Sequence, residues 1–343
     1  MIEFKNHTNY SKTIDRDFIE FFQGQRILIS GASGLLGMHF AQLFQTFNSD
    51  FDGKTEITVI SKTGIFPFAL DKKVQIIQQD LTESLLPNGL GTFDSIIHGA
   101  GYGQPSKFLS EKLKTIHLNT STTMELSKLA RPEGSFLFIS SSELYSGLAN
   151  PPFREDQIGT SNTNHPRSSY IESKRTGEAI ISAMKSEFPS MVASCARLAL
   201  AYGPGTKPGD SRVLYELISK GLTDGEIVLR DSGSAIRTYC FVTDAIEQCI
   251  AILMKADDHI YNVGGKSKIT VAELAMQIGQ ILEVPVRIPK VSKQFLTDAP
   301  QEVWLDLTKI EELSGKKKYV NLKDGLEQTI SWMKNARNQV KTN

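Results

Sequence analysis

The sequence of 343 residues contains little cysteine and has no net charge, and both features narrow the range of functions. Cys195, Cys240 and Cys249 lack the spacing of a metal site, which argues against a zinc module or a disulfide framework and favours a reducing compartment. Basic and acidic residues number 38 each, so no excess charge would attract nucleic acid. We therefore expect buried thiols, no metal centre and no nucleic-acid partner.

Long apolar runs are also missing. No stretch approaches the roughly 18 apolar residues of a membrane-spanning helix. The opening MIEFKNHTNYSK is polar and lacks the apolar segment of a secretory signal. We expect a cytoplasmic protein without membrane contact, long enough to bury a large core as one or two domains.

Short apolar runs alternate with segments of helix-forming residues. The alternation predicts an α/β fold with a doubly wound parallel sheet. Its strands are expected at 26–30, 57–61, 74–77, 94–98, 136–140 and 192–198, with helices such as 109–130 and 168–187 between them. The run PGTKPGD after residue 203 interrupts the pattern, and the amphipathic stretch 270–282 is typical of a helix in a second, smaller α/β lobe.

A glycine-rich turn at 26–37, RILISGASGLLG, stands between a predicted buried strand and a predicted helix. Gly31, Gly34 and Gly37 are spaced three residues apart. Glycines in this context permit a tight turn and a close approach of backbone to a pyrophosphate, which then faces the helix N-terminus. The pattern therefore predicts a Rossmann-type dinucleotide site.

We expect three parts in the chain. Residues 1–24 form an N-terminal extension on the surface, and 25–203 form the Rossmann domain. Residues 204–343 form mainly a substrate-binding lobe, whose chain interleaves with the Rossmann domain. Within this lobe, Lys316–Lys318 is expected to be a solvated turn.

Tyr170 and Lys174 stand four residues apart in PRSSYIESKRTGEA, on one face of a predicted helix. An ammonium beside a phenol favours the phenolate, so we expect Lys174 to lower the pKa of Tyr170 from its usual value near 10. Such a tyrosine can exchange a proton with a substrate hydroxyl. The hydroxyls of Ser140–Ser142 follow a predicted strand, at the sheet edge where ligands bind.

Together these motifs resemble the extended short-chain dehydrogenase/reductase family, NAD(P)-dependent enzymes that modify nucleotide sugars. The resemblance runs from about residue 25 to 333. Further segments similar to family landmarks are IIHGAG at 96–101, Asn119, RLALAYGPG at 197–205 and DSGSAIRTYCFVTDAIE at 231–247. The resemblance implies tightly bound NAD or NADP, a nucleotide-diphosphate sugar as substrate, and a homodimer.

The resemblance also assigns roles to individual residues. The catalytic residues it implies are Ser141, Ser142, Glu143, Tyr170 and Lys174. Besides Tyr170 and Lys174, the implied cofactor-binding residues are Gly31, Ser33, Gly34, Leu35, Leu36, Gly37, Ser61, Lys62, Asp80, Leu81, Gly99, Ala100, Gly101 and Asn119. Substrate binding is assigned to Arg167, Arg212 and Arg237, of which Arg237 matches the family's diphosphate-binding arginine.

Two positions depart from the family pattern. Ser61, followed by Lys62, stands where the family's ribose-binding acid is expected, and this pair permits a 2′-phosphate, so NADP stays open. Asp80 resembles the adenine contact and suits either cofactor. Leu200 replaces the usual asparagine of RxxNxYGP, which removes a polar contact near the substrate phosphates.

Around the serine cluster the sequence is most similar to UDP-glucuronate decarboxylases, through Ser142–Glu143, Arg167, Lys174–Arg175 and Arg212–Val213. The implied reaction begins with oxidation of the sugar at C4 by Tyr170, Lys174 and Ser141. Decarboxylation follows, or dehydration with Glu143 as the base at C5. The alternatives are a 4-epimerase, an NADPH-dependent 4-keto-sugar reductase and a non-catalytic cofactor-binding protein on the same fold.

Overall fold

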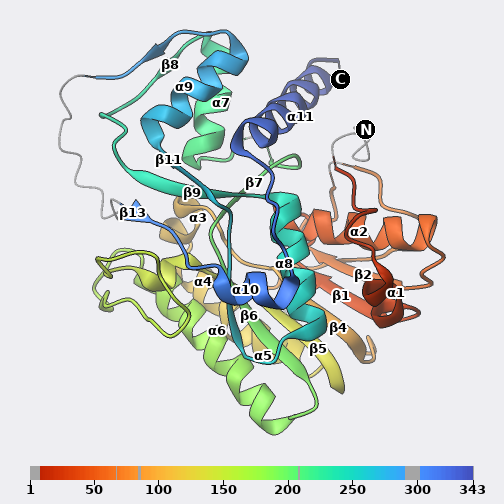
Figure 1. Ribbon diagram of the computed structural model, residues 1–343. Helices are drawn as coiled ribbons and strands as arrows, with labels where there is room; N and C mark the ends of the chain where they lie inside the picture. Colours follow the sequence, from red (N-terminus) through yellow and green to blue (C-terminus); the bar gives the residue numbers. More distant parts are fainter. Residues whose placement is uncertain (1–7, 67, 84–85, 208, 290–301, 343) are drawn as a thin grey trace.

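A parallel sheet forms the centre of the larger lobe in the computed structural model, which describes residues 8–66, 68–83, 86–207, 209–289 and 302–342 (Figure 1). Within these residues the sheet has seven strands. In spatial order they are β10 (Ile260–Val263), β6 (Val192–Leu198), β5 (Ala130–Ser141), β4 (Phe93–His98), β1 (Arg26–Ser30), β2 (Glu56–Ser61) and β3 (Gln75–Gln78). Every neighbouring pair is parallel, which confirms the predicted doubly wound sheet.

Helices cover both faces of this sheet, and this explains the apolar runs of its strands. Ile27 and Ile29 of β1 pack in one core with residues of α2 (Leu35–Asp50) and α8 (Val242–Lys255). Leu28 points to the opposite face, into a core shared with α6 (Ser168–Glu187). The predicted helix at 168–187 is confirmed.

The expectation of a single helix over 109–130 is wrong. The structure has α3 (Pro105–Ser110), α4 (Lys112–Asn119) and α5 (Ser121–Ser127), and β5 begins at Ala130. Glu111 leaves helical geometry at the first break, and Thr120 separates α4 from α5 at the second with a φ of -118° and a ψ of -77°. Threonine hydroxyls at 115, 120 and 123 each bond a carbonyl four residues earlier, a local interaction that competes with straight helix.

The smaller lobe is built on β9 (Ile236–Phe241), seen with its helices at the top of Figure 1. β9 pairs with β11 (Ser267–Thr270), β13 (Glu302–Val303) and β7 (Leu200–Tyr202). A separate core joins it to α7 (Val213–Asp224), α9 (Val271–Leu282) and α11 (Leu322–Thr342), and β8 (Ile227–Val228) pairs with β12 (Val286–Arg287). A capping box of Thr270 and Glu273 begins α9, within the predicted range.

The chain passes back and forth between the two lobes. After β9 it returns to the large sheet as α8 and β10, and α10 (Thr308–Ser314) also packs against these two elements. The lobes therefore interleave, and the boundary at 203/204 stays a prediction. In the described part of the chain, none of the helices has the length and apolar character needed to cross a membrane.

The N-terminal segment differs from the expected surface extension. Phe18 and Phe22 of α1 (Arg16–Phe22) are buried against Phe44 of α2. The buried Tyr10 hydroxyl forms a hydrogen bond with Nδ1 of His39, also on α2. The described part of this segment therefore belongs to the core of the larger lobe.

The expected solvated turn at Lys316–Lys318 is wrong for its first residue. The Lys316 side chain is only 9% exposed, and its ammonium contacts Asp244 at 2.9 Å and also Glu247. Asp244 in turn accepts a hydrogen bond from the Val320 backbone. Lys316 therefore joins the first turns of α8 to the segment that leads into α11.

Replacing Lys316 by alanine should destabilise the protein by about 3 kcal/mol, because it leaves the buried Asp244 carboxylate without its cation. Urea unfolding at neutral pH measures the change. Lys317→Ala is the matched control, since Lys317 is exposed, and it should alter stability by less than about 0.5 kcal/mol. Equal effects of the two substitutions would contradict the structural role of Lys316.

Candidate active site

The glycine turn packs directly against the turn after β4. Gly31 has φ +69°, and a Cβ added there would lie 2.6 Å from Ala100 N and from the carbonyl of Gly99. A Cβ on Gly37 would lie 2.4 Å from the Gly31 carbonyl oxygen. Only glycine allows this approach, and Gly34 then leads into α2 as its N-cap. The free N–H groups at Leu35 and Leu36 suit a pyrophosphate.

A lysine that the sequence analysis did not single out reaches this turn from the other lobe. Lys207 Nζ donates to Ser33 Oγ at 3.2 Å. The loop that carries Lys207 is held by a hydrogen bond of 2.9 Å between His39 Nε2 and the Pro204 carbonyl oxygen. Burial lowers the pKa of Lys207. A cation beside the positive end of α2 is favourable when an anion lies between them. The only sequence signal was the interruption PGTKPGD.

The end of β2 carries the expected ribose-side residues. Ser61 is buried, and its Oγ has no hydrogen-bond partner among the described residues, so it can bind a ligand hydroxyl. Lys62 lies 2.6 Å from Asp80, which raises the pKa of Lys62. Burial opposes ionisation of Asp80, but hydrogen bonds from Lys62 and Thr82 lower its pKa to about 2. Next to Asp80, Leu81 is buried.

The side chains of Asn119 and Lys174 both lie close to Gly101. A Cβ on Gly101 would lie 3.4 Å from Asn119 Oδ1 and 3.5 Å from Lys174 Nζ. Asn119 is fully buried; its Nδ2 donates to Ser173 Oγ at 3.0 Å, while its Oδ1 has no partner among the described residues. These unsatisfied oxygens, together with the glycine turn, fit a bound dinucleotide.

Tyr170 and Ser141 are brought together at the carboxyl end of β5. Both are buried, and the phenol ring stacks on Phe108 of α3 with 4.4 Å between ring centroids. Burial raises the pKa of Tyr170 to about 12, although a hydrogen bond with Ser141 acts in the opposite direction. Phe108 is a further site residue without a signal in the sequence.

The expectation that Lys174 lowers the pKa of Tyr170 is therefore wrong for this structure. Lys174 Nζ donates to the Ile139 carbonyl oxygen at 2.6 Å and lies 5.9 Å from the centroid of the Tyr170 ring. Burial lowers the pKa of Lys174 to about 7. The amine thus faces the backbone of β5, and burial dominates the pKa of each group.

Charged residues of both lobes meet beside Tyr170. Arg167, the N-cap of α6, lies 2.5 Å from Glu143, and both side chains are less than one-third exposed. Glu143 belongs to the short helix η2 (Ser142–Tyr145) that follows β5, where Ser142 is half-buried. Burial lowers the pKa of Arg237 on β9, and the charge of Glu143 acts to raise it. The Arg237 guanidinium therefore lies within electrostatic reach of the ion pair.

Arg212 begins α7 and is held by its own loop. Its Nε and Nη2 donate to the two oxygens of Asp210 at 3.0 and 2.7 Å, and Nη1 donates to the Ala201 carbonyl. The charge of Arg212 nevertheless acts on Tyr170 and favours its ionised form, against the larger effect of burial. Leu200, which replaces the family asparagine, is partly exposed at the start of β7.

Comparison with known proteins identifies the family. Residues 27–264 match the model of the NAD dependent epimerase/dehydratase family. The chain belongs to this family. It is 27% identical to UDP-glucuronic acid decarboxylase 5 of Arabidopsis thaliana over 88% of this chain and 87% of the relative. It is 28% identical to UDP-glucuronic acid decarboxylase 1 of Danio rerio over 90% and 72% of the two chains.

Solved structures of this family share the fold. The epimerase Mth375 of Methanothermobacter thermautotrophicus has a TM-score of 0.80 at 17% identity, covering 98% of this chain and 99% of that one. DesIV, a dTDP-glucose 4,6-dehydratase of Streptomyces venezuelae solved with NAD, has a TM-score of 0.75 at 21% identity, covering 92% and 98%. The expected membership of the extended short-chain dehydrogenase/reductases is confirmed, as is NAD-dependent enzyme chemistry.

Ser61→Asp should shift the ratio of dissociation constants toward NAD and away from NADP. A carboxylate at this buried position repels a 2′-phosphate and can accept a hydrogen bond from the ribose hydroxyl. Titration of the protein with each cofactor measures the ratio. Ser61→Ala, which removes the hydroxyl without adding charge, is the control. An unchanged ratio in the aspartate variant would place Ser61 away from the ribose.

Proposed function

We propose that this protein oxidises C4 of a nucleotide-diphosphate sugar with NAD and then releases a C5 carboxylate of the sugar as carbon dioxide, after which C5 takes up a proton and the hydride returns to C4. The observation that carries the proposal is the Glu143–Arg167 ion pair beside Tyr170, whose charges also act on Arg237. The sequence relatives named as UDP-glucuronic acid decarboxylases support the substrate class.

The proton of the C4 hydroxyl goes to Tyr170 in this proposal. Burial holds the phenol in its neutral form, but the charges of Arg212 and Arg167 and the Ser141 hydrogen bond favour the phenolate. Lys174 adds a cation on the same helix face, and Ser141 can bond the same sugar oxygen. The glycine turn, Ser61, Asp80, Asn119 and Lys207 would hold NAD, which would supply the hydride acceptor when bound.

Loss of the carboxylate needs no base on the protein. Once C4 is a ketone, the C5 carboxylate is β to a carbonyl, so the electrons of the breaking C–C bond flow into the ketone. Glu143 is already engaged by Arg167 at 2.5 Å, which agrees with a route that does not use it to remove a proton. Arg167 and Arg237 instead suit the negative charges of a uronic acid and a diphosphate.

Dehydration is the second candidate. Glu143 is half-buried next to the Ser141 hydroxyl, and its backbone N–H donates to Ser141 Oγ at 3.2 Å, a position from which a carboxylate could remove a C5 proton. A keto-sugar reductase using NADPH is less well supported, because Lys62 is paired with Asp80. An epimerase would need the same C4 oxidation. The non-catalytic alternative does not fit the family, whose members are enzymes.

The decisive experiment is mass spectrometry of products from a panel of UDP-, GDP-, CDP- and dTDP-sugars with NAD, with and without NADPH. We expect loss of carbon dioxide from a nucleotide hexuronate. Tyr170→Phe should lower turnover by about 100- to 10,000-fold, because proton transfer is removed. Glu143→Gln should leave carbon dioxide release largely intact.

Other products would refute decarboxylation. Loss of water from a neutral hexose, with reduced nicotinamide accumulating in Glu143→Gln, would establish the dehydratase instead. A gain of two hydrogens that depends on NADPH would establish the reductase, and products of unchanged mass would establish the epimerase. Cofactor binding by each variant shows that a loss of turnover is not a loss of the fold.

We also propose that the partner is a second copy of the chain. Leu113 and Ile116 lie on one face of α4 and are 82% and 40% exposed, and Met124 on α5 is 48% exposed. An apolar face of this kind on consecutive helices supports a homodimer. A reducing compartment such as the cytoplasm suits the three cysteines, which are buried and unpaired.

Leu113→Glu should convert the dimer into a monomer, because it places a charge on the proposed interface. Light scattering after size-exclusion chromatography measures the mass. Ile65→Glu is the control, since Ile65 is 73% exposed but lies outside these helices. A mass that stays dimeric in Leu113→Glu, or a monomeric native chain, would exclude this interface.

A further inference from the structure

A buried ion pair lies one helical turn beyond Lys174. Glu178 of α6 binds Arg197 of β6 with both carboxylate oxygens, Oε1 to Nε at 3.0 Å and Oε2 to Nη2 at 2.9 Å. The side chains are 8% and 3% exposed. Ser140 Oγ also donates to Glu178 Oε1, at 2.6 Å. One carboxylate therefore joins α6, β5 and β6.

The network continues from Arg197 to the segment that carries Glu143. Arg197 Nη1 donates to the Tyr145 hydroxyl at 3.0 Å and to the backbone carbonyl of Gln157 at 3.0 Å. Tyr145, the last residue of η2, donates to Asn262 Oδ1 on β10 at 2.7 Å. The Arg197 guanidinium thus also binds η2, the short helix that carries Glu143.

Each anchor of the network is a close neighbour in sequence of a proposed catalytic residue. Ser140 precedes Ser141, Tyr145 follows Glu143 by two residues, and Glu178 follows Lys174 by four. Because a buried, doubly hydrogen-bonded ion pair tolerates little change in geometry, it holds these segments in one register.

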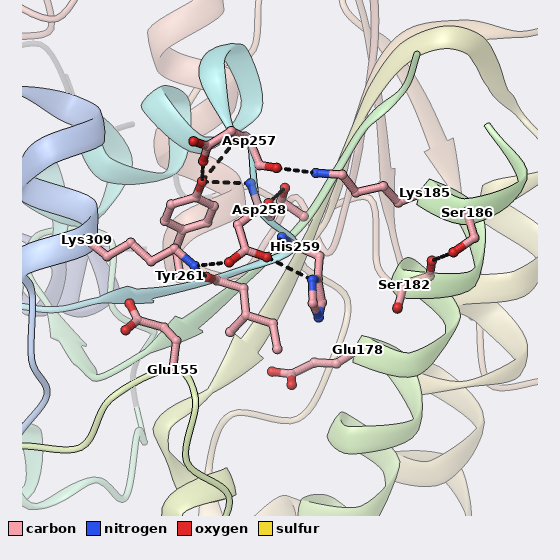
Figure 2. A network of polar contacts seen from close by, with 12 residues as sticks. Glu155, Glu178, Ser182, Lys185, Ser186, Asp257, Asp258, His259, Tyr261 and Lys309 are labelled. Carbon is pink, nitrogen blue, oxygen red and sulfur yellow. Dashed lines mark hydrogen bonds and ion pairs between the residues drawn. The ribbon is translucent and has the colours of Figure 1, made fainter. Parts of the chain in front are cut away.

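A contact at the other end of α6 provides a contrast. Figure 2 shows Glu178 and, farther along the same helix, Lys185, where Lys185 Nζ donates to the Asp257 carbonyl at 2.8 Å. A separate polar cluster lies at β10 and in the loop just before it. It consists of Asp257, Asp258, Tyr261 and Lys309. Lys185 therefore ties α6 to the loop before β10 and contacts none of the segments that carry the proposed catalytic residues.

The charges around Lys174 give the pair a second role. The groups that act on or contact Lys174 are Tyr170 and Glu178 of α6, Cys195 of β6, His98 of β4, and the Phe138 ring and Ile139 carbonyl of β5. Burial keeps three of these groups neutral. It raises the pKa of Tyr170 to about 12 and that of Cys195 well above its usual range, and it lowers the pKa of His98 to about 3.

Among these described groups, Glu178 is the carboxylate, and it is ion-paired with Arg197. Burial lowers the pKa of Lys174 to about 7, and the charge of Glu178 acts to raise it. Arg197 neutralises part of that charge. The protonation of Lys174 therefore depends on the balance between the two partners.

We propose that Glu178 and Arg197 are positioning residues that hold α6 in register with Ser141 and Glu143 and set the charge of Lys174 beside Tyr170. The proposal rests on the proposed function, in which Lys174 acts as a cation.

Titration of Lys174 by NMR tests this directly in the protein without substrate. Lysines are labelled with ¹³C at Cε, and the Lys174 signal is assigned by its loss in Lys174→Arg. Glu178→Gln keeps the shape but removes the negative charge, so the Lys174 titration should move down by about one pH unit. Arg197→Gln leaves Glu178 without its partner, so the titration should move up.

A purely structural role would not produce opposite shifts, since both substitutions break the same contact. Glu178→Gln/Arg197→Gln, which leaves no unpaired buried charge, should titrate above Glu178→Gln because the repulsive Arg197 charge is also gone, and it serves if Arg197→Gln does not fold. Lys185→Ala should leave the Lys174 titration unchanged. No shift in Glu178→Gln, or shifts of one sign in both single variants, would overturn the proposal.

The pH dependence of turnover separates this proposal from the proposed function. If Lys174 must be protonated, activity falls as pH rises through its pKa, so the alkaline limb should move to lower pH in Glu178→Gln. NMR shifts of the expected signs with an unmoved limb would refute the role of Lys174 as catalytic cation, and would also refute Glu178 as a positioning residue for the reaction.

Discussion

Burial of one face of α6 against the sheet is the constraint on which the candidate site depends. Tyr170 and Lys174 are 6% and 5% exposed. Burial disfavours both charged forms, so it raises the pKa of the phenol to about 12 and lowers that of the amine to about 7. The ionisation of the two groups therefore depends on their neighbours, which are Ser141, Arg212 and Arg167 for the phenol and Glu178 for the amine.

The arrangement of the lobes brings these charges to the site. Arg237 and Arg212 belong to the smaller lobe. Arg167, at the start of α6, and Glu143, in η2, belong to the larger one. Lys207, on the connection between β7 and α7, reaches back to Ser33 in the glycine turn. The candidate cofactor and substrate residues thus come from both lobes. The interleaved chain, with β10 in the large sheet and α8 packed on it, ties the lobes together.

Features that depend on neighbouring residues in the chain could be predicted. The strands of the larger sheet follow from short apolar runs, α6 from an uninterrupted run of helix formers, and α9 from its amphipathic pattern. The glycine turn follows from spacing alone, because only glycine avoids the contacts that Gly31 and Gly37 make. The break in 109–130 was missed because threonine side chains bond the backbone there, an interaction that apolar periodicity does not register.

The sequence by itself determined six strands of the larger sheet, the dinucleotide-type turn and the placement of Tyr170 and Lys174 on one helix face. Tertiary structure alone decided which charges meet. Lys316 is buried because Asp244 lies beside it in space, and Lys174 faces the Ile139 carbonyl because α6 packs on β5. The physical reason is that helix and turn formation are local, whereas burial and the electric field at a side chain sum over groups distant in sequence.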